Sequence, residues 1–517
     1  MKKIQSLFPL RRISILFLLL LHIATALLVT YTYLTVTDTL SHNRLWESTK
    51  TTLGKGVMGA YTFMYSPIAL HEDRLNLGAW HGFQELIFRR ALALREISFD
   101  CYLEEKSYLV FIFNKDETGF DGIRISTHPL FKNIYFTATP DGKFLKKKPV
   151  PGGPVTPGEW HQVEIVFSRD SFSLIIDNRL ITQFAGTVKA SQQIGFRGSL
   201  QNVTVDNVRA YGPKKTLLFQ EDFSNRRAYI LTFCIVFLGI GVFHLLFFGI
   251  RSLVRRDGGS SLKNRIKVSI ILLGIAGSFY LFIYHVSTRY PRLTPALKAQ
   301  EDYWMDSTSE YIRAAISKKY SMVPDDDFRI LFLGSSQTWG AGAMDSDRTF
   351  VRITEANLNE HDDDVSYRCI NGGISAIDTR ELFYIYQKEW IQLDPKMVIL
   401  NLSSNDSDPL LFYEYLEKLV LLNEAEHIRT VFSLEANSIE YQPGPLPLHA
   451  VMKEVARKYD VPIIDLHGYL LTHYDDGFLW WDRVHLAPYG HVLTGEFFAD
   501  KIKKIVRKES IRLSHGK

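Results

Sequence analysis

The sequence lacks the features of a disulfide-stapled, strongly charged or disordered protein. Only three of its 517 residues are cysteine, which is too few for a disulfide framework. The formal net charge of +4 is too small to indicate nucleic acid as a partner, and we expect none. With 46% hydrophobic and 22% charged residues, the composition excludes a disordered or collagen-like chain. The length corresponds to about three domains.

Charged side chains are also absent from three long stretches. A mean hydropathy of −0.04 excludes a transporter that is mostly embedded in lipid. Residues 13–37, 228–250 and 268–288, however, contain no Asp, Glu, Lys or Arg. Because a helix needs ~20 residues to cross the hydrocarbon core, we expect three transmembrane helices and a lipid bilayer as partner. The first stretch is either an uncleaved anchor, which its length favours, or a signal peptide cleaved near residues 24–26.

Basic residues flank these stretches and predict an orientation. Four of them precede residue 13, and six lie between residues 251 and 267. The positive-inside rule therefore places residues 1–12 and 251–267 in the cytoplasm. Residues 38–227 and 289–517 would then be extracytoplasmic, as in a multi-pass protein of a bacterial inner membrane whose large domains face the periplasm.

The external segment 38–227 predicts a β-sandwich. Short runs alternate apolar and polar residues, are rich in β-branched and aromatic side chains, and are separated by turns rich in Gly, Pro, Asp and Asn. These runs are residues 108–114, 133–137, 161–168, 171–176 and 203–209. No helical pattern separates them, which favours an antiparallel sandwich.

Part of this segment carries a family resemblance. Residues 158–165, 173–178 and 203–209 resemble the tryptophan strand, the following strand end and the closing strand of laminin-G and concanavalin-like jelly rolls. The resemblance covers residues 95–212. It implies a module that binds glycans through aromatic faces or, if Trp160 belongs to the core, a spacer or protein-interaction domain.

Two cysteines, Cys101 and Cys369, lie in the external segments but in different predicted domains. They could pair in an oxidising compartment. Two buried free thiols are the more common arrangement for such isolated residues, and this is what we expect.

After a linker at residues 289–325, which is expected to form a helical stalk, residues 326–517 predict an α/β domain. Nearly continuous apolar runs alternate with helical stretches, as in parallel strands that are buried on both faces. The runs are residues 329–333, 365–370, 397–402, 429–434 and 461–465. A doubly wound sheet follows from this pattern, with its chemistry at the carboxyl ends of the strands.

Four of these strand ends or following loops carry candidate site residues. They are Gly-Ser-Ser-Gln-Thr-Trp-Gly at 334–340, Asn-Gly-Gly-Ile-Ser at 371–375, Ser-Ser-Asn-Asp at 403–406 and Asp-Arg-Val-His-Leu at 482–486. In order and position they resemble the SGNH (GDSL-like) hydrolase family. The pattern of that family is Gly-Asp-Ser-x-Thr-x-Gly, a later Gly, Gly-x-Asn-Asp and finally Asp-x-x-His. The resemblance covers roughly residues 328–506.

The resemblance and the chemistry of acyl transfer imply the same roles. Ser336 matches the nucleophile, His485 is the candidate base, and Asp482 would hold the imidazole in the required tautomer. The family stabilises the tetrahedral oxyanion with the backbone N–H groups of Ser336 and Gly373 and with the side-chain amide of Asn405. No metal or organic cofactor is implied.

Some residues in these blocks depart from the pattern or have no assigned role. Ser335 replaces the usual Asp beside the nucleophile, and Ser403 replaces the usual Gly of the third block. Neither position reacts in the family, so the departures bear on substrate preference more than on catalysis. Trp480 and Trp481 belong either to a hydrophobic wall of the site or to the core, and His491 has no assigned role.

The expected protein is therefore membrane-anchored and multidomain, with a jelly-roll-like β-sandwich, a three-layer doubly wound SGNH domain and three transmembrane helices. The favoured function is a serine esterase that removes O-acyl groups, mainly acetyl, from a cell-surface or exported polysaccharide. An SGNH-type O-acetyltransferase acting on an exported polysaccharide is the alternative. A non-catalytic envelope scaffold is a third hypothesis.

Overall fold

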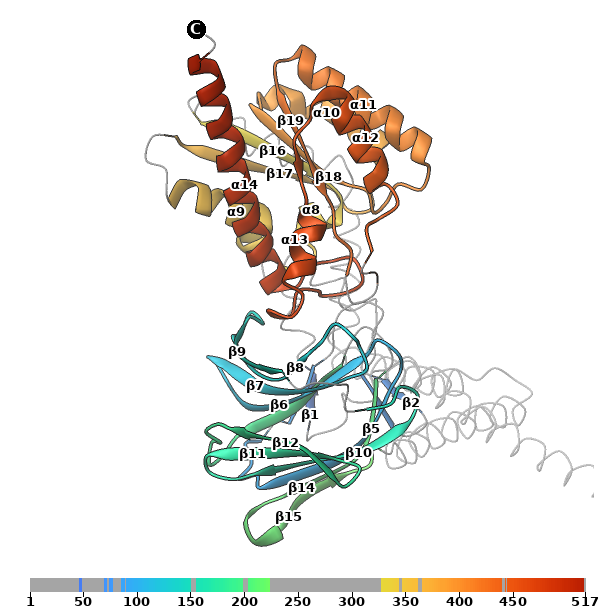
Figure 1. Ribbon diagram of the computed structural model, residues 1–517, viewed down its shortest axis with the longest axis vertical. Helices are drawn as coiled ribbons and strands as arrows, with labels where there is room; N and C mark the ends of the chain where they lie inside the picture. Colours follow the sequence, from blue (N-terminus) through green and yellow to red (C-terminus); the bar gives the residue numbers. More distant parts are fainter. Residues whose placement is uncertain are drawn as a thin grey trace, which may run out of the picture. The chain divides into compact units, whose positions relative to one another are not determined.

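The computed structural model contains a β-rich N-terminal region and an α/β C-terminal domain (Figure 1). The residues that it describes are 46–48, 69–71, 74–77, 85–88, 90–149, 155–198, 203–223, 327–343, 346–360, 365–438, 442 and 444–515.

The structure corrects the membrane-anchored fold class. Across the ranges just given, no helix combines the length and the apolar character needed to cross a membrane. Helix α14 (Pro488–His515) has 28 residues, but Asp, Glu, Lys and Arg recur along it. The stretches 13–37, 228–250 and 268–288, and the linker 289–325, lie outside the described residues. What the structure supports is a β-rich region followed by an α/β domain.

The β-rich region consists of two antiparallel sheets. The first has the order β1 (Trp46–Ser48), β4 (Glu85–Phe88), β13 (Gln193–Gly198), β6 (Tyr108–Asp116), β7 (Gly119–Ser126), β8 (Asn133–Ala138), β9 (Phe144–Pro149). The second has the order β12 (Arg179–Ala185), β11 (Ser171–Ile176), β10 (Trp160–Phe167), β5 (Glu96–Leu103), β14 (Val203–Tyr211), β3 (Arg74–Asn76), β2 (Ala69–His71), and β15 (Leu217–Glu221) pairs with β14. A 3-10 turn, η3 (Pro213–Lys215), precedes β15.

Alternating burial holds the two sheets together. In β5 every second side chain is buried, because successive residues of a strand point to opposite faces. Phe99 of β5 contacts Phe111 and Phe196 of the first sheet, with ring centroids 6.1 and 5.0 Å apart. Trp160, at the start of β10, is 41% exposed and is therefore not a core tryptophan. The region is a sandwich of two sheets with an aromatic core.

The two cysteines outside the apolar stretches remain unpaired, as expected. Cys101 and Cys369 are both buried and free. Burial raises the thiol pKa of both residues, since the charged thiolate loses its hydration. The thiols therefore behave as small apolar side chains of their cores.

The C-terminal domain has one parallel sheet, and the strands expected from the apolar runs are present in it. The order is β17 (Tyr367–Gly373), β16 (Phe328–Gly334), β18 (Met397–Leu402), β19 (Arg429–Leu434), β20 (Ile463–Ile464). In chain order, β16 is the first strand of this sheet, β17 pairs with one of its edges, and β18, β19 and β20 follow from its other edge. The ends of β16 and β18 are therefore adjacent, and this is the topological switch point where open α/β sheets place their sites.

Helices cover both faces of this sheet (Figure 1). Leu331 and Leu333 of β16 face a core shared with α10 (Thr379–Lys388), α11 (Pro409–Ala425) and α12 (His449–Tyr459). Phe332 faces the opposite core, with α9 (Phe350–Glu360), α13 (Leu466–Thr472) and α14. Short helical turns, α8 (Ser336–Trp339), η4 (Ser346–Arg348) and η5 (Trp390–Leu393), complete the domain.

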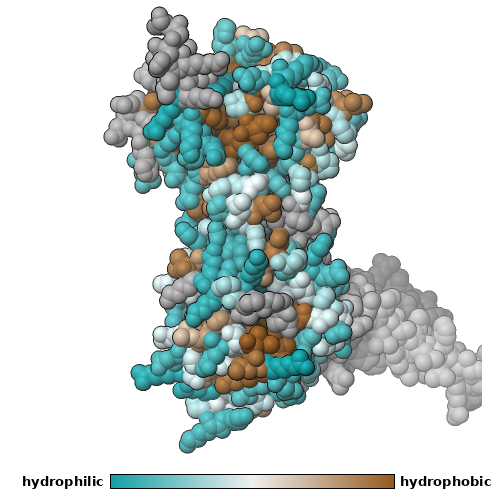
Figure 2. Space-filling model, in the orientation of Figure 1, coloured by the Kyte–Doolittle hydropathy of each residue, from teal (hydrophilic) through white to brown (hydrophobic). Residues whose placement is uncertain are grey.

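The visible surface is mostly hydrophilic, with local apolar areas (Figure 2). Among the large exposed apolar residues is Leu410, which is 82% exposed near the start of α11. The preceding Asp408 caps that helix, because its carboxylate accepts from the N–H groups of Leu410 and Leu411.

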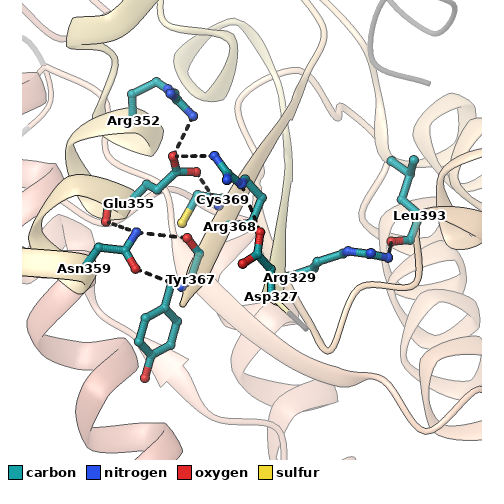
Figure 3. A network of polar contacts seen from close by, with 9 residues as sticks. All are labelled: Asp327, Arg329, Arg352, Glu355, Asn359, Tyr367, Arg368, Cys369 and Leu393. Atoms are coloured by element: carbon teal, nitrogen blue, oxygen red, sulfur yellow. Dashed lines mark hydrogen bonds and ion pairs between the residues drawn. The ribbon is translucent and has the colours of Figure 1, made fainter. Parts of the chain in front are cut away.

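A polar network joins α9 to the edge strand β17 (Figure 3). The Glu355 carboxylate accepts the Cys369 N–H at 2.7 Å and is paired with Arg352 at 2.8 Å. Arg368 lies 3.4 Å from the same carboxylate. This buried glutamate thus has both a backbone donor and cationic partners.

Candidate active site

A chain of hydrogen bonds joins three of the residues expected at the site. The Oγ of Ser336 lies 2.8 Å from the Nε2 of His485, and the Nδ1 of His485 lies 2.6 Å from the Oδ2 of Asp482. With the proton of the imidazole on Nδ1, His485 donates to the carboxylate and accepts from the serine hydroxyl. This arrangement prepares the serine for proton transfer.

The turn at residues 482–485 holds its own carboxylate in place. Asp482 is fully buried, and its Oδ1 accepts the N–H groups of Val484 and His485 at 2.8 and 2.7 Å. The other oxygen remains directed at the His485 ring. The spacing Asp-x-x-His therefore does more than bring two side chains close, since it fixes the direction of the carboxylate as well.

The nucleophile lies where β16 turns sharply into α8. Gly334 ends the strand, and a Cβ at this position would lie 2.0 Å from the Thr338 Oγ1. Gly340 ends the helix with a φ of +112°, in the left-handed region that glycine adopts without strain. These two glycines allow a one-turn helix that starts with Ser336, which is half-buried.

Gly373 lies at the end of β17 and packs against α8. A Cβ there would come within 2.0 Å of the Trp339 backbone nitrogen, so no larger residue fits. The Gly373 N–H donates to the Oδ1 of Asn371 at 3.0 Å. The family resemblance assigned the N–H of this glycine to the oxyanion. The structure shows a further need for glycine here, the close contact of the end of β17 with the helix of the nucleophile.

Asn405 follows β18 at the same end of the sheet. It is exposed, and its side-chain Nδ2 donates to the Ile377 carbonyl at 3.1 Å, which orients the amide. The next residue, Asp406, accepts both the N–H and the hydroxyl of Thr379. Desolvation by burial raises the pKa of Asp406. The described hydrogen bonds connect Ser336 to His485, but not to Gly373 or Asn405.

Sequence reasoning missed Gln337, the residue after the nucleophile. Its Nε2 donates to the carbonyl of Ala436 at 2.6 Å and to the carbonyl of Val484. Gln337 is 1% exposed, so these bonds form away from water. They tie the start of α8 to the turn that carries His485. A polar residue inside the nucleophile block was the available signal, but it matched no position of the family pattern.

The structure assigns different surroundings to Trp480 and Trp481, for which the sequence allowed either a wall of the site or the core. Trp480 packs in the core beneath α14. The Trp481 ring lies 5.9 Å from the His485 ring, between centroids, and is 2% exposed. Trp480 is thus a core residue, whereas Trp481 is a wall beside the histidine.

His491 supports the fold around the site rather than taking part in the hydrogen-bond chain. Its Nδ1 accepts the Phe350 N–H at 3.3 Å, and its Nε2 lies 3.0 Å from the Ala341 carbonyl. Complete burial lowers the pKa of His491 to about 4, because the imidazolium would be desolvated.

The turn at 482–485 is preceded by a segment that contacts the sandwich, residues 473–478. Residues Leu75–Asp222 and Ala299–Lys517 belong to one compact unit. Two backbone hydrogen bonds of 2.9 Å, from Phe144 N–H to the Asp476 carbonyl and from Phe478 N–H to the Gly142 carbonyl, join the segment to the β8–β9 hairpin. The sandwich therefore helps to hold in place the segment that leads to the turn of Asp482 and His485.

Side chains strengthen this contact with a buried ion pair. The Arg124 Nη1 of β7 lies 2.7 Å from the Asp475 Oδ1, and the two side chains are 2% and 13% exposed. The guanidinium also stacks 4.3 Å from the Phe131 ring centroid. Phe478 inserts among three rings of the sandwich, those of Phe120, Phe136 and Phe144. This sandwich face is covered by the chain's own residues.

The two ion pairs that residues 475 and 476 form with the sandwich should contribute very differently to the free energy of unfolding. Arg124→Ala leaves the Asp475 charge poorly hydrated, so we expect a loss of about 3–5 kcal/mol in the free energy of unfolding. Lys147→Ala removes the partner of Asp476, whose pair is about one-third exposed, and should cost about 0–1 kcal/mol. Urea denaturation of both variants checks this, and equal losses would contradict it.

The burial of His491 predicts a pH dependence of stability. The folded pKa of about 4 lies below the unfolded value of about 6.5, so the unfolded chain binds a proton that the folded chain refuses. The contribution is present above pH 6.5 and is lost as the pH falls towards 4. We expect His491→Gln to lose less stability than the wild type between pH 7 and pH 5, measured by thermal unfolding. Parallel pH profiles would refute this.

Comparisons with known proteins concern the C-terminal domain. Residues 332–493 match the model of the GDSL-like lipase/acylhydrolase family. Similar solved structures include the acetyl xylan esterase AlAXEase (20% identity, 34% of this chain and 99% of that chain, TM-score 0.30). They also include a lipase/acylhydrolase from Enterococcus faecalis (21% identity, 34% and 95%, TM-score 0.30) and an acetyl-xylooligosaccharide esterase from Geobacillus stearothermophilus (18% identity, 35% and 96%, TM-score 0.31). No curated protein matches the chain.

The matched segment extends from β16 into α14 and includes the hydrogen-bonded serine, histidine and aspartate. It does not include the sandwich, so the resemblance of residues 95–212 to jelly rolls stays a prediction. The family match covers residues 332–493, which is less than half of the chain, and it supports an enzyme of the SGNH hydrolase type.

Proposed function

We propose that this protein is a serine esterase that removes O-acyl groups, acetyl first among them, from a glycan. The observation that carries the proposal is the 2.8 Å hydrogen bond between Ser336 Oγ and His485 Nε2, with Asp482 behind the imidazole. A nucleophile, a base and an orienting carboxylate in this order are the parts that acyl transfer needs.

In the proposed reaction His485 takes the hydroxyl proton while the Ser336 oxygen attacks the ester carbonyl. The tetrahedral intermediate collapses, the glycan oxygen leaves with the proton from His485, and the acyl group stays on Ser336. Water then gives a proton to the same imidazole and attacks the acyl-enzyme. The bond to Ser336 breaks, the imidazolium returns the proton to the serine oxygen, and the carboxylic acid is released. Asp482 stabilises the imidazolium in both halves of the cycle.

The three expected oxyanion donors differ in how available they are. The exposed Asn405 amide is oriented by Ile377 and is suited to this role, together with the backbone N–H of Ser336. The Gly373 N–H is engaged by Asn371 at 3.0 Å, so it contributes only after that side chain turns away.

A glycan substrate is supported by an aromatic pair on the sandwich. The Trp160 side chain is 41% exposed, and its ring lies 5.7 Å from that of Tyr102, between centroids. An exposed indole face suits the apolar face of a sugar ring, and the half-buried Tyr102 ring lies beside it. The pair belongs to the strands β10 and β5, and the sheet face that packs against residues 473–478 is a different part of the sandwich.

The nucleophile is tested with a fluorophosphonate probe, which forms a bond from serine oxygen to phosphorus and releases fluoride. We expect the wild type and Ser168→Ala, a variant of an exposed sandwich serine, to be labelled equally. Ser336→Ala should show no labelling and a loss of esterase activity of at least about 10³-fold. Labelling that persists in Ser336→Ala, or is absent from the wild type, would reject the proposed mechanism.

The substrate class is tested with acetylated polysaccharide and p-nitrophenyl acetate. We expect Trp160→Ala to raise KM for the polysaccharide about 10-fold, because ring stacking is lost, and to leave p-nitrophenyl acetate hydrolysis unchanged. Released acetate is the expected product. If the acyl group instead appears on an added glycan acceptor, the enzyme is a transferase. Identical kinetics of Trp160→Ala and wild type on the polysaccharide would remove the support for glycan binding there.

A further inference from the structure

A buried glutamate, Glu435, lies directly behind the candidate site. It follows the last residue of β19 and is fully buried. Its Oε2 accepts the Ser404 hydroxyl at 2.6 Å and the Ser404 N–H at 2.9 Å. The Ser335 hydroxyl donates to Oε1 at 3.1 Å, and the Ser403 hydroxyl lies 3.4 Å from Oε2.

Two of these serines precede residues with proposed roles in the reaction. Ser335 precedes the nucleophile, and although it occupies the N-cap position of α8, its hydroxyl makes no capping bond. It points to Glu435 instead. Ser404 precedes Asn405, the exposed amide of the third block. A single carboxylate therefore connects the turn of Ser336 with the loop of Asn405.

The third serine is held at a cost in backbone free energy. Ser403 has a φ of +155°, in the region that glycine adopts freely and other residues rarely adopt. A glycine would remove the strain but also the hydroxyl that faces Glu435. Ser335 and Ser403 are the two positions at which the sequence departs from the family pattern, and both side chains converge on this carboxylate.

Stability alone does not account for Glu435. Among the described residues its side-chain partners are three hydroxyls and one amide, all neutral, and desolvation by burial raises the pKa of the carboxyl. Burying a carboxyl group without a cation is unfavourable, and this cost of desolvation would be absent if the whole cluster were apolar. Glu355, which is also buried, has two arginines beside it.

We propose that Glu435 is a positioning residue of the hydrolase, which holds the Ser336 turn and the Asn405 loop at their working separation through Ser335, Ser403 and Ser404. This inference rests on the proposed function. Its expected signature is a loss of turnover without a loss of stability, because the carboxylate orders groups that act in the transition state and contributes little to folding.

Glu435→Gln tests this signature, since the amide keeps the shape but replaces one acceptor oxygen with a donor. We expect the rate of fluorophosphonate labelling and kcat for p-nitrophenyl acetate to fall about 10-fold, with KM within twofold of wild type. The thermal unfolding midpoint should stay equal or rise. Ser403→Gly should show the same separation, with a higher midpoint from the relieved backbone and slower labelling.

Ser335→Asp tests whether the side chain at position 335 acts through Glu435. It places a second carboxylate against Glu435, and like charges repel, so labelling should fall by about 30-fold. In the double variant Ser335→Asp with Glu435→Gln, the new carboxylate can accept from the amide. We expect the double variant to be labelled about 10-fold faster than Ser335→Asp alone. A purely additive result would remove the coupling on which the proposal depends.

The matched control is Glu355→Gln, in the network that joins α9 and β17 (Figure 3). It should lower the unfolding midpoint, because Arg352 loses its ion-pair partner and Arg368 keeps only Asp327, while labelling stays within twofold of wild type. If wild type is labelled and Glu435→Gln is labelled equally fast, the positioning role is refuted and the proposed function stands. If wild type is not labelled, the proposed function fails first.

Discussion

The site depends on one separation, that between Ser336 Oγ and His485 Nε2. These residues are 149 positions apart in the sequence, and the 2.8 Å hydrogen bond joins the first strand of the domain to its last loop. A shift of about 1 Å would break it, because the strength of a hydrogen bond falls steeply beyond its usual distance. The surrounding structure can be understood as the set of contacts that keep this distance fixed.

Three sets of contacts do this. On one side Gln337 bonds to the carbonyl of Val484, within the turn that carries the histidine. On another, Gly373 packs so closely on α8 that only glycine fits. In addition, the ion pair of Arg124 and Asp475 joins the sandwich to the segment that precedes the turn. The sandwich thus has a structural role in supporting the turn of Asp482 and His485, whether or not it also binds a ligand through other residues.

The sequence predicted much of this arrangement because parallel strands and family blocks leave local signals. Nearly continuous apolar runs gave the five strands of the C-terminal sheet, and the blocks gave the serine, histidine and aspartate that the structure brings together. It could not predict contacts that depend on tertiary packing. Gln337 and Glu435 belong to no spaced motif, and the need for glycine at 373 comes from a helix in another part of the chain. The membrane-anchored fold class was wrong as a description of the part of the chain that the structure describes, since apolar composition alone does not establish a spanning helix.

Two carboxylates near the site, those of Asp475 and Glu435, show two ways in which the protein accommodates an acidic group that is largely removed from water. Asp475 lies against a guanidinium and accepts from Asn133 as well, so its charge is balanced and removing the partner is costly. Glu435 meets neutral donors, and one of them, Ser403, is itself in a strained conformation. A fold selected for stability alone would replace this cluster with apolar side chains and a glycine. Its presence directly behind the nucleophile is therefore best explained by the geometry that it imposes on Ser336 and Asn405.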